Sequence, residues 1–167
     1  MQHHHHTLSP VVAAPAGTMR DAARPHSGWT WLVFRFSGAL AVLGVGAVHL
    51  EAYTGPYSAI PTIGTLFIVN FVTATVIGLV LLAPLEHVAG AWAGPAVVLV
   101  TAAGMAVAGV SYVMLYISER TPLFGFQEPG YDPAAISASR WVELAAFALL
   151  GISLLLRFAT RSPARRW

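Results

Sequence analysis

His49, Glu51 and Tyr53 stand at the end of the first long apolar stretch of this chain, and Asn70 lies inside the second. A histidine can bind a metal or transfer a proton near neutral pH. A carboxylate can also bind a metal or transfer a proton, although its ordinary pKa is lower. Ionisable side chains within a membrane span are costly, so they usually face the interior of a helix bundle or a cavity. We therefore expect any functional site to lie around these residues.

Helical geometry divides this group. At about 100° per residue, Gly46, His49 and Tyr53 fall on one face of a helix, while Glu51 lies roughly 200° away from His49. A joint metal site of His49 and Glu51 would require the helix to end near Leu50. The simpler alternative is that His49 lies close to the membrane surface and only bonds a backbone carbonyl or water.

Asn70 and Thr73 lie about one turn apart in the second stretch. An amide in lipid needs hydrogen-bond partners, and asparagine commonly finds them on a neighbouring helix. We therefore expect Asn70, with Thr73, to make an interhelical polar contact rather than to bind a ligand.

The remaining acidic and aromatic residues near the same predicted side of the membrane complete a candidate outward-facing pocket. Its predicted members are His49, Glu51, Tyr53, Tyr116, Glu119 and Glu143, with Glu128 and Asp132 in the loop above. The segment 121–131 could cover this pocket, or its aromatic side chains could enter the membrane interface or contact a partner. For Glu143 the simpler alternative is an ion pair with Arg140, three residues earlier on the same helix.

The chain excludes several kinds of chemistry. It has no cysteine, and therefore no disulfide, thiolate metal site or iron–sulfur cluster. The presence of only one histidine within a span, His49, argues against a haem with two histidine ligands, although a His49–Met114 ligand pair stays open. No phosphate-binding, dinucleotide, HExxH or GxSxG motif is present. The sequence identifies no metal or cofactor, and it predicts no enzymatic activity.

Composition determines the class of protein. Hydrophobic residues make up 56% of the chain and charged residues 10%, whereas soluble domains average about 25% charged residues. Four stretches are long and apolar enough to cross a bilayer, at about 31–53, 61–85, 95–118 and 141–160. We predict an all-α fold, a four-transmembrane-helix bundle in the lipid bilayer. The fourth helix is expected to begin near Pro133, with Asp132 as its N-cap.

Arginine predicts the orientation. The amino-terminal flank carries Arg20, Arg24 and Arg35, and the carboxyl-terminal flank carries Arg157 and the later arginines. By the positive-inside rule we predict that the protein lies in the plasma membrane with both termini in the cytoplasm. We predict that residues 1–29 form a disordered cytoplasmic segment, 30–160 the membrane domain with an outward loop at 119–140, and 161–167 a basic cytoplasmic tail. The histidines at 3–6 are either native or a tag. The net charge of +2 comes from the two termini, and no basic patch is interleaved with aromatic residues, which argues against nucleic-acid binding.

One pattern resembles a known group. The residues run His49-Leu50-x-x-Tyr53, Tyr57-x-x-Ile60-Pro61-Thr62-Ile63-Gly64-x-Leu66-Phe67-x-x-Asn70. This stretch is similar to small four-helix membrane proteins of high-GC Gram-positive bacteria, which are mostly hypothetical proteins. The resemblance covers about the first two spans. It implies a four-helix plasma-membrane protein and assigns no functional residue.

Two functions from different classes remain. The first is a non-enzymatic accessory or interaction subunit of a membrane assembly, with a membrane-protein partner or self-association. Small residues at four-residue spacing, Ala102 with Ala106 and Gly104 with Ala108, favour such close helix packing. The second is a binding or redox module whose outward pocket holds a metal, a quinone or a lipid headgroup. A small channel or transporter is disfavoured, because the predicted midplane is uncharged.

Overall fold

The computed structural model describes residues 27–161, and all four predicted spans are helices in it. In chain order the elements are α1 (Ser27–Thr54), η1 (Pro56–Ala59), α2 (Pro61–Leu82), α3 (Leu85–Val88), η2 (Gly90–Trp92), α4 (Ala93–Ser118) and α5 (Pro133–Arg161). The described residues form no strand beyond one isolated bridge, between Leu123 and Phe126. Most of the segment expected to be disordered (1–26) and most of the basic tail fall outside the described residues. Residues 27–29, which were also expected to be disordered, form the first turn of α1.

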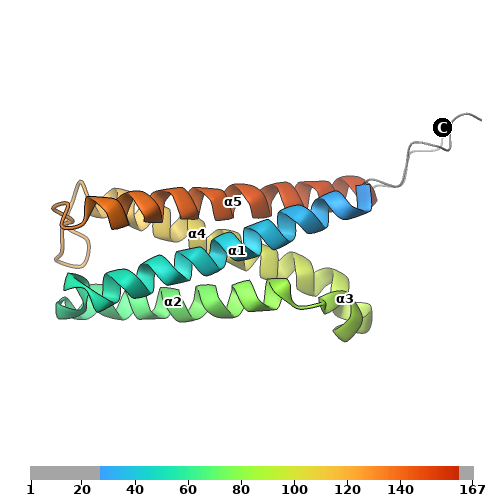
Figure 1. Cartoon of the computed structure of the whole chain (residues 1–167), viewed down its shortest axis with the longest axis horizontal. Coiled ribbons are helices and arrows are strands. Elements are labelled where there is room, and N and C mark those ends of the chain that lie inside the picture. The colour runs from blue at the N-terminus through green and yellow to red at the C-terminus, as the bar shows by residue number, and fades with distance from the viewer. Residues whose placement is uncertain (1–26, 162–167) are drawn as a thin grey trace, which may run out of the picture.

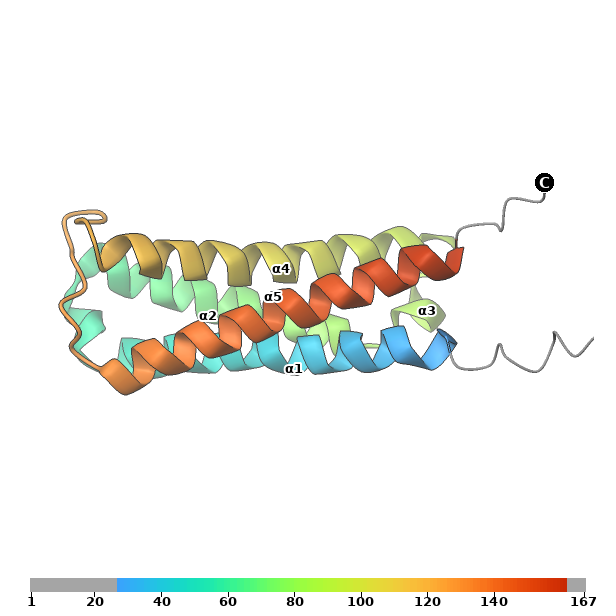
Figure 2. The same cartoon turned by 90° about the horizontal axis from the view of Figure 1, so that it is seen from above.

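The four long helices run up and down in an antiparallel bundle (Figure 1). In cyclic order they are α1, α2, α4 and α5, each packed against its two neighbours, and the α2–α4 seam is the least closely packed of the four. The described chain ends and α3 lie at one end of the bundle, which we call the proximal end. The opposite end, with η1 and the loop between α4 and α5, is the distal end (Figure 2).

The long helices can each cross a membrane. The shortest, α2, has 22 residues and so spans about 33 Å at 1.5 Å per residue, slightly more than the hydrocarbon thickness of a bilayer. The four candidate spans are Trp29–Thr54, Pro61–Leu82, Gly90–Ser118 and Pro133–Thr160. Large apolar side chains cover the outside of the bundle, including Leu40, Val76, Leu99 and Leu155. The chain is therefore a small multi-pass membrane protein, an all-α bundle of four spanning helices.

Helix ends follow the local sequence closely. Pro61 and Pro133 occupy first-turn positions, where the missing N–H costs nothing. Asp132 caps α5 as predicted, because its Oδ1 accepts hydrogen bonds from the backbone N–H groups of Ala134 and Ala135 at 3.0 and 2.9 Å. α2 ends at Leu82, three residues before its predicted end. Ala83 precedes Pro84 and is extended, as expected for a residue before proline.

Small residues allow α1, α4 and α5 to approach closely. A Cβ atom added to Gly38 of α1 would lie 2.5 Å from Leu150 Cδ2 of α5, so a larger residue there would displace the Leu150 side chain. On α4, Gly104 and Ala108 are buried in the core, as the predicted packing face requires. Ala102 and Ala106, the other predicted pair, lie on the exposed side of the same helix.

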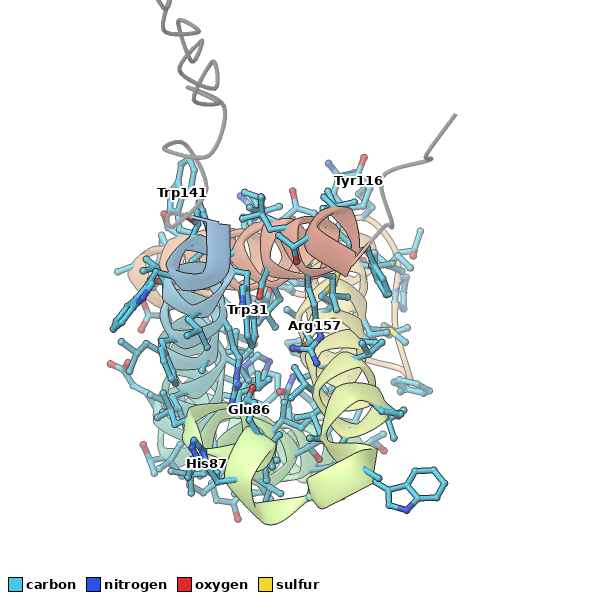
Figure 3. The ribbon with its side chains drawn as sticks, turned by 90° about the vertical axis from the view of Figure 1, so that its right-hand side faces the viewer. Trp31, Glu86, His87, Tyr116, Trp141 and Arg157 are labelled. Carbon is cyan, nitrogen blue, oxygen red and sulfur yellow. The ribbon has the colours of Figure 1, made fainter. Side chains whose placement is uncertain are left out.

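A buried arginine fixes the proximal end. Arg35 of α1 is fully buried, and its guanidinium donates to the carbonyls of Leu81 and Ala83 at 2.9 and 2.6 Å and to Glu86 at 2.5 Å. Arg157 of α5 stacks over the Trp31 ring, 4.8 Å from its centre. Figure 3, seen from this end, shows Trp31, Glu86 and Arg157 pointing into the space between the helices. This cluster ties the end of α2 and α3 to α1.

Candidate functional site

The polar residues of the distal half converge from all four spanning helices. His49 lies on α1, Asn70 on α2, Ser111 on α4, and Ser139 and Glu143 on α5. His49 is 8% exposed and Glu143 is 1% exposed, although their helices present apolar side chains to lipid. We call these five residues the distal polar cluster.

The hydrogen-bond partners of His49 indicate the tautomer of its ring. His49 Nδ1–H donates to the carbonyl of Val45 one turn earlier, at 2.8 Å, which leaves Nε2 as an acceptor. Asn70 Nδ2 donates to this Nε2 at 3.0 Å and also to Ser111 Oγ. The rings of His49 and Phe67 pack edge to face, with their centres 5.3 Å apart. Asn70 thus joins α2 to both α1 and α4.

Glu143 completes the cluster from α5. Its Oε1 accepts a hydrogen bond from Ser139 Oγ at 2.9 Å and lies 3.9 Å from His49 Nε2. Within residues 27–161, two enclosed side-chain oxygens have no hydrogen-bond partner, namely Glu143 Oε2 and Asn70 Oδ1. A buried polar atom without a partner is costly and calls for an explanation. Asn70 Oδ1 can only accept hydrogen bonds, and the same holds for Glu143 Oε2 when the carboxyl is ionised.

A cavity of about 480 Å³ adjoins the cluster. Its walls are mostly apolar, and they come from α1, α2, α4, α5 and the loop between α4 and α5. Leu66 and Val69 of α2 and Val110 and Met114 of α4 line this cavity and are also exposed on the outside of the bundle. The cavity is therefore open along the α2–α4 seam, towards the surrounding lipid.

The loop between α4 and α5 covers the distal end of the cavity, which is one of the positions that the sequence left open for it. Leu123, Phe124, Phe126 and Glu128 of this loop line the cavity. Phe124 and Gly125 both have positive φ, at 53° and 81°. Paired backbone bonds between Leu123 and Phe126 close a tight turn around them. Such a turn needs positive φ at both central positions, which glycine adopts without strain.

A second buried contact holds the loop to η1. Tyr57 is buried, and its hydroxyl donates to Glu128 Oε2 at 2.7 Å. Glu128 Oε1 accepts from the backbone N–H groups of Gly130 and Tyr131 at 2.8 and 3.1 Å. Burial of its ring, and after that the hydrogen bond to Glu128, raises the pKa of Tyr57. The carboxylate of Glu128 therefore orders the loop as well as anchoring it.

The structure brings together two of the six residues predicted for the outward pocket, His49 and Glu143. Glu51 is exposed, as its position two residues after His49 requires, and Tyr53 does not line the cavity. Tyr116 is exposed. Glu119 pairs at the surface with Arg140 and Arg120. The alternative of an Arg140–Glu143 pair is wrong, because Arg140 turns outwards to α4 while Glu143 faces the interior.

The interhelical role predicted for Asn70 matches its hydrogen bonds, and Thr73 lines the cavity nearby. Sequence reasoning did not identify Ser111 and Ser139 as members of the cluster. Ser111 follows Gly104 and Ala108 at helical spacing, and that small-residue face was the available signal. Ser139 lies four residues before Glu143, one turn away on the same face. Among residues 27–161 no three histidine or acidic side chains lie close enough to hold a metal ion.

Comparison of the chain with protein-family models, with curated proteins and with solved structures finds no match. The fold and the cavity thus define a class only, a four-helix integral membrane protein with a buried polar cluster in its distal half.

Proposed function

We propose that this protein binds an amphipathic molecule, one with an apolar body and a polar head, in the distal cavity. The observation that carries the proposal is the cavity itself, which has mostly apolar walls and adjoins a polar cluster to which every spanning helix contributes a residue. Its volume of about 480 Å³ lies within the range of small-molecule sites, roughly 300 to 1,000 Å³. Such sites combine mostly apolar walls with a few placed polar groups.

An apolar layer separates the distal polar cluster from the buried arginines of the proximal end, and this layer favours ligand binding over ion conduction. Val42, Val45, Ala108, Ala146 and Leu150 are completely buried there. This layer supports a closed bundle, because an ion pathway needs polar groups or water along its length. The accessory role within a larger assembly, expected from the sequence, stays a prediction, and ligand binding is compatible with it. We propose that the distal end lies on the extracytoplasmic side of the plasma membrane, as the arginine distribution predicts.

The test uses two exposed alanines one turn apart on α4. Ala106 lines the cavity and Ala102 does not, so Ala106→Trp should fill the cavity while Ala102→Trp adds the same ring to the lipid-facing surface. Each protein is purified in mild detergent, and its bound lipids are extracted and quantified by mass spectrometry. We expect one amphipathic molecule near equimolar amounts in wild type and Ala102→Trp, reduced at least tenfold in Ala106→Trp. Identical lipid profiles in all three proteins would contradict the proposal.

A further inference from the structure

The distal polar cluster has two acceptor oxygens that no group of the described residues satisfies. Both amide hydrogens of Asn70 are used, one on His49 and one on Ser111. Asn70 Oδ1 and Glu143 Oε2 remain without a partner. A head group that supplies N–H or O–H donors would satisfy both oxygens, whereas a carbonyl or an ester would satisfy neither.

The charges around Glu143 point to a cation. His49 Nε2 already accepts from Asn70, so this ring is neutral and cannot neutralise the carboxylate 3.9 Å away. Arg140, one turn earlier on α5, pairs with Glu119 instead. No other ion pair to Glu143 occurs within the described part of the chain. A carboxylate in apolar surroundings is stable only when a countercharge and hydrogen bonds compensate for its lost hydration.

Access to the cluster runs through the bilayer. The exposed lining residues lie on both sides of the least closely packed seam, with Leu66 and Val69 on α2 and Val110 and Met114 on α4. The distal end is covered by the loop, which Glu128 and Tyr57 hold in place. A ligand dissolved in the membrane can therefore reach the cavity sideways, with its alkyl chain remaining among apolar side chains.

On the basis of the proposed binding function, we propose that the ligand is a membrane-dissolved amphiphile with a primary ammonium head, which enters between α2 and α4. The ammonium group inserts between Asn70 and Glu143. It donates to Asn70 Oδ1 and to the Glu143 carboxylate, and its positive charge compensates for the charge of Glu143. The alkyl chain lies along Val69 and Val110 and leaves through the seam.

The test compares three probes that share one chain length. Hexadecylamine, 1-hexadecanol and methyl hexadecanoate are titrated against the full-length protein in phosphatidylcholine nanodiscs, and binding is read by native mass spectrometry. We expect hexadecylamine to bind at least tenfold more tightly than the ester. Glu143→Gln keeps the size of the side chain, and should weaken amine binding by roughly tenfold to a hundredfold, the value of one charge-assisted hydrogen bond. Glu119→Gln, which removes a carboxylate outside the cavity, should change nothing.

The outcomes separate this inference from the proposed function. If the alcohol or the ester binds as tightly as the amine, and Ala106→Trp abolishes binding, the ammonium assignment is overturned while the cavity remains a binding site. If no probe binds in a manner sensitive to Ala106→Trp, both fail. Unchanged amine binding by Glu143→Gln also overturns the assignment.

The entry route is tested with two exposed valines of α2. Val69 and Val76 are 54% and 56% exposed and lie two turns apart, but only Val69 lines the cavity. Val69→Trp should slow association of hexadecylamine at least tenfold, and Val76→Trp should leave the association rate as in wild type. Equal rates in both variants would overturn entry through the α2–α4 seam.

Discussion

The side chain of Asn70 donates one amide hydrogen to His49 and the other to Ser111, so a single residue connects three spanning helices. In a bilayer these bonds compete with lipid rather than with water. The unfolded chain in the membrane also finds partners, and each interhelical bond therefore contributes only about 0.6 kcal/mol on average. Asn70 lies at the junction of α1, α2 and α4, so both of its bonds are interhelical.

Asn70→Leu should destabilise the bundle by about 1 to 2 kcal/mol, because two interhelical bonds are lost and Ser111 and His49 Nε2 are left without this donor. The measurement is the unfolding free energy in mixed micelles titrated with sodium dodecyl sulfate and followed by circular dichroism. Thr65→Val is the control, since Thr65 bonds only the Pro61 carbonyl of its own helix. A leucine variant as stable as wild type would show that the bonds of Asn70 contribute nothing net.

Tyr57 gives a prediction in alkaline solution. Burial and the Glu128 hydrogen bond raise its pKa above the ordinary value of about 10. Because the phenol holds its proton more tightly in the folded protein than in the unfolded chain, its contribution to stability is complete below pH 10. That contribution is lost as the pH rises through the folded-state pKa.

In folded protein Tyr57 should therefore not ionise between pH 9 and pH 11. Absorbance at 295 nm, which reports phenolate, should rise by the same amount in wild type and in Tyr57→Phe over this range. A smaller rise in the phenylalanine variant than in wild type would mean that Tyr57 ionises in this range and that its contact with Glu128 is weaker than the structure indicates.

At the scale of single residues, the sequence predicts what depends on one helix alone. Helical geometry predicted that His49 and Glu51 lie on different faces of α1, and they do. Glu51, which was also predicted for the pocket, is exposed and does not line the cavity. It could not predict that Arg140 pairs with Glu119, because that pair depends on α4 and α5 being neighbours at their distal ends. Ser111 was likewise visible only as a small residue, since its partner comes from a helix 41 residues away in the chain.

The elements themselves were predictable because each carries its own signals. Length and hydropathy define the four spans, while proline and a capping aspartate define where α2 and α5 begin. The role of Arg35 had no such signal. In the sequence it is one of several flanking arginines, but in the structure it is fully buried and bonds the end of α2.

Replacing Arg35 should loosen the proximal end of α2. Three separately directed bonds require the guanidinium fork, so Arg35→Lys cannot reproduce them. We expect Arg35→Lys to lose about 2 to 3 kcal/mol of unfolding free energy, measured as for Asn70, because two buried carbonyls lose charged donors. Glu86→Gln is the control and should cost under about 1 kcal/mol, since the Glu86 side chain is more than a third exposed. Equal effects of the two changes would contradict the role assigned to the carbonyl bonds.

At the scale of the whole molecule, two polar regions lie at opposite ends of an apolar bundle. The proximal region contains Arg35 and Arg157, and the distal region contains His49 and Glu143. The cyclic order of the helices, which creates the open α2–α4 seam, does not follow from the sequence, because four apolar helices can pack in several orders with similar burial. The asymmetry of charge between the two ends does follow from it, and this asymmetry predicts orientation in the membrane.

The orientation can be tested because the chain contains no cysteine, so one introduced cysteine is the single site for a maleimide. Gln127 is exposed in the distal loop and Ala91 is exposed in η2 at the proximal end. We expect a membrane-impermeant maleimide to label Gln127→Cys in intact cells, and Ala91→Cys only after permeabilisation, because the arginine-rich flanks should remain in the cytoplasm. The reverse pattern would place the distal cavity on the cytoplasmic side, and its amphiphile would then come from the inner leaflet. Labelling of both cysteines in detergent shows that each is reachable.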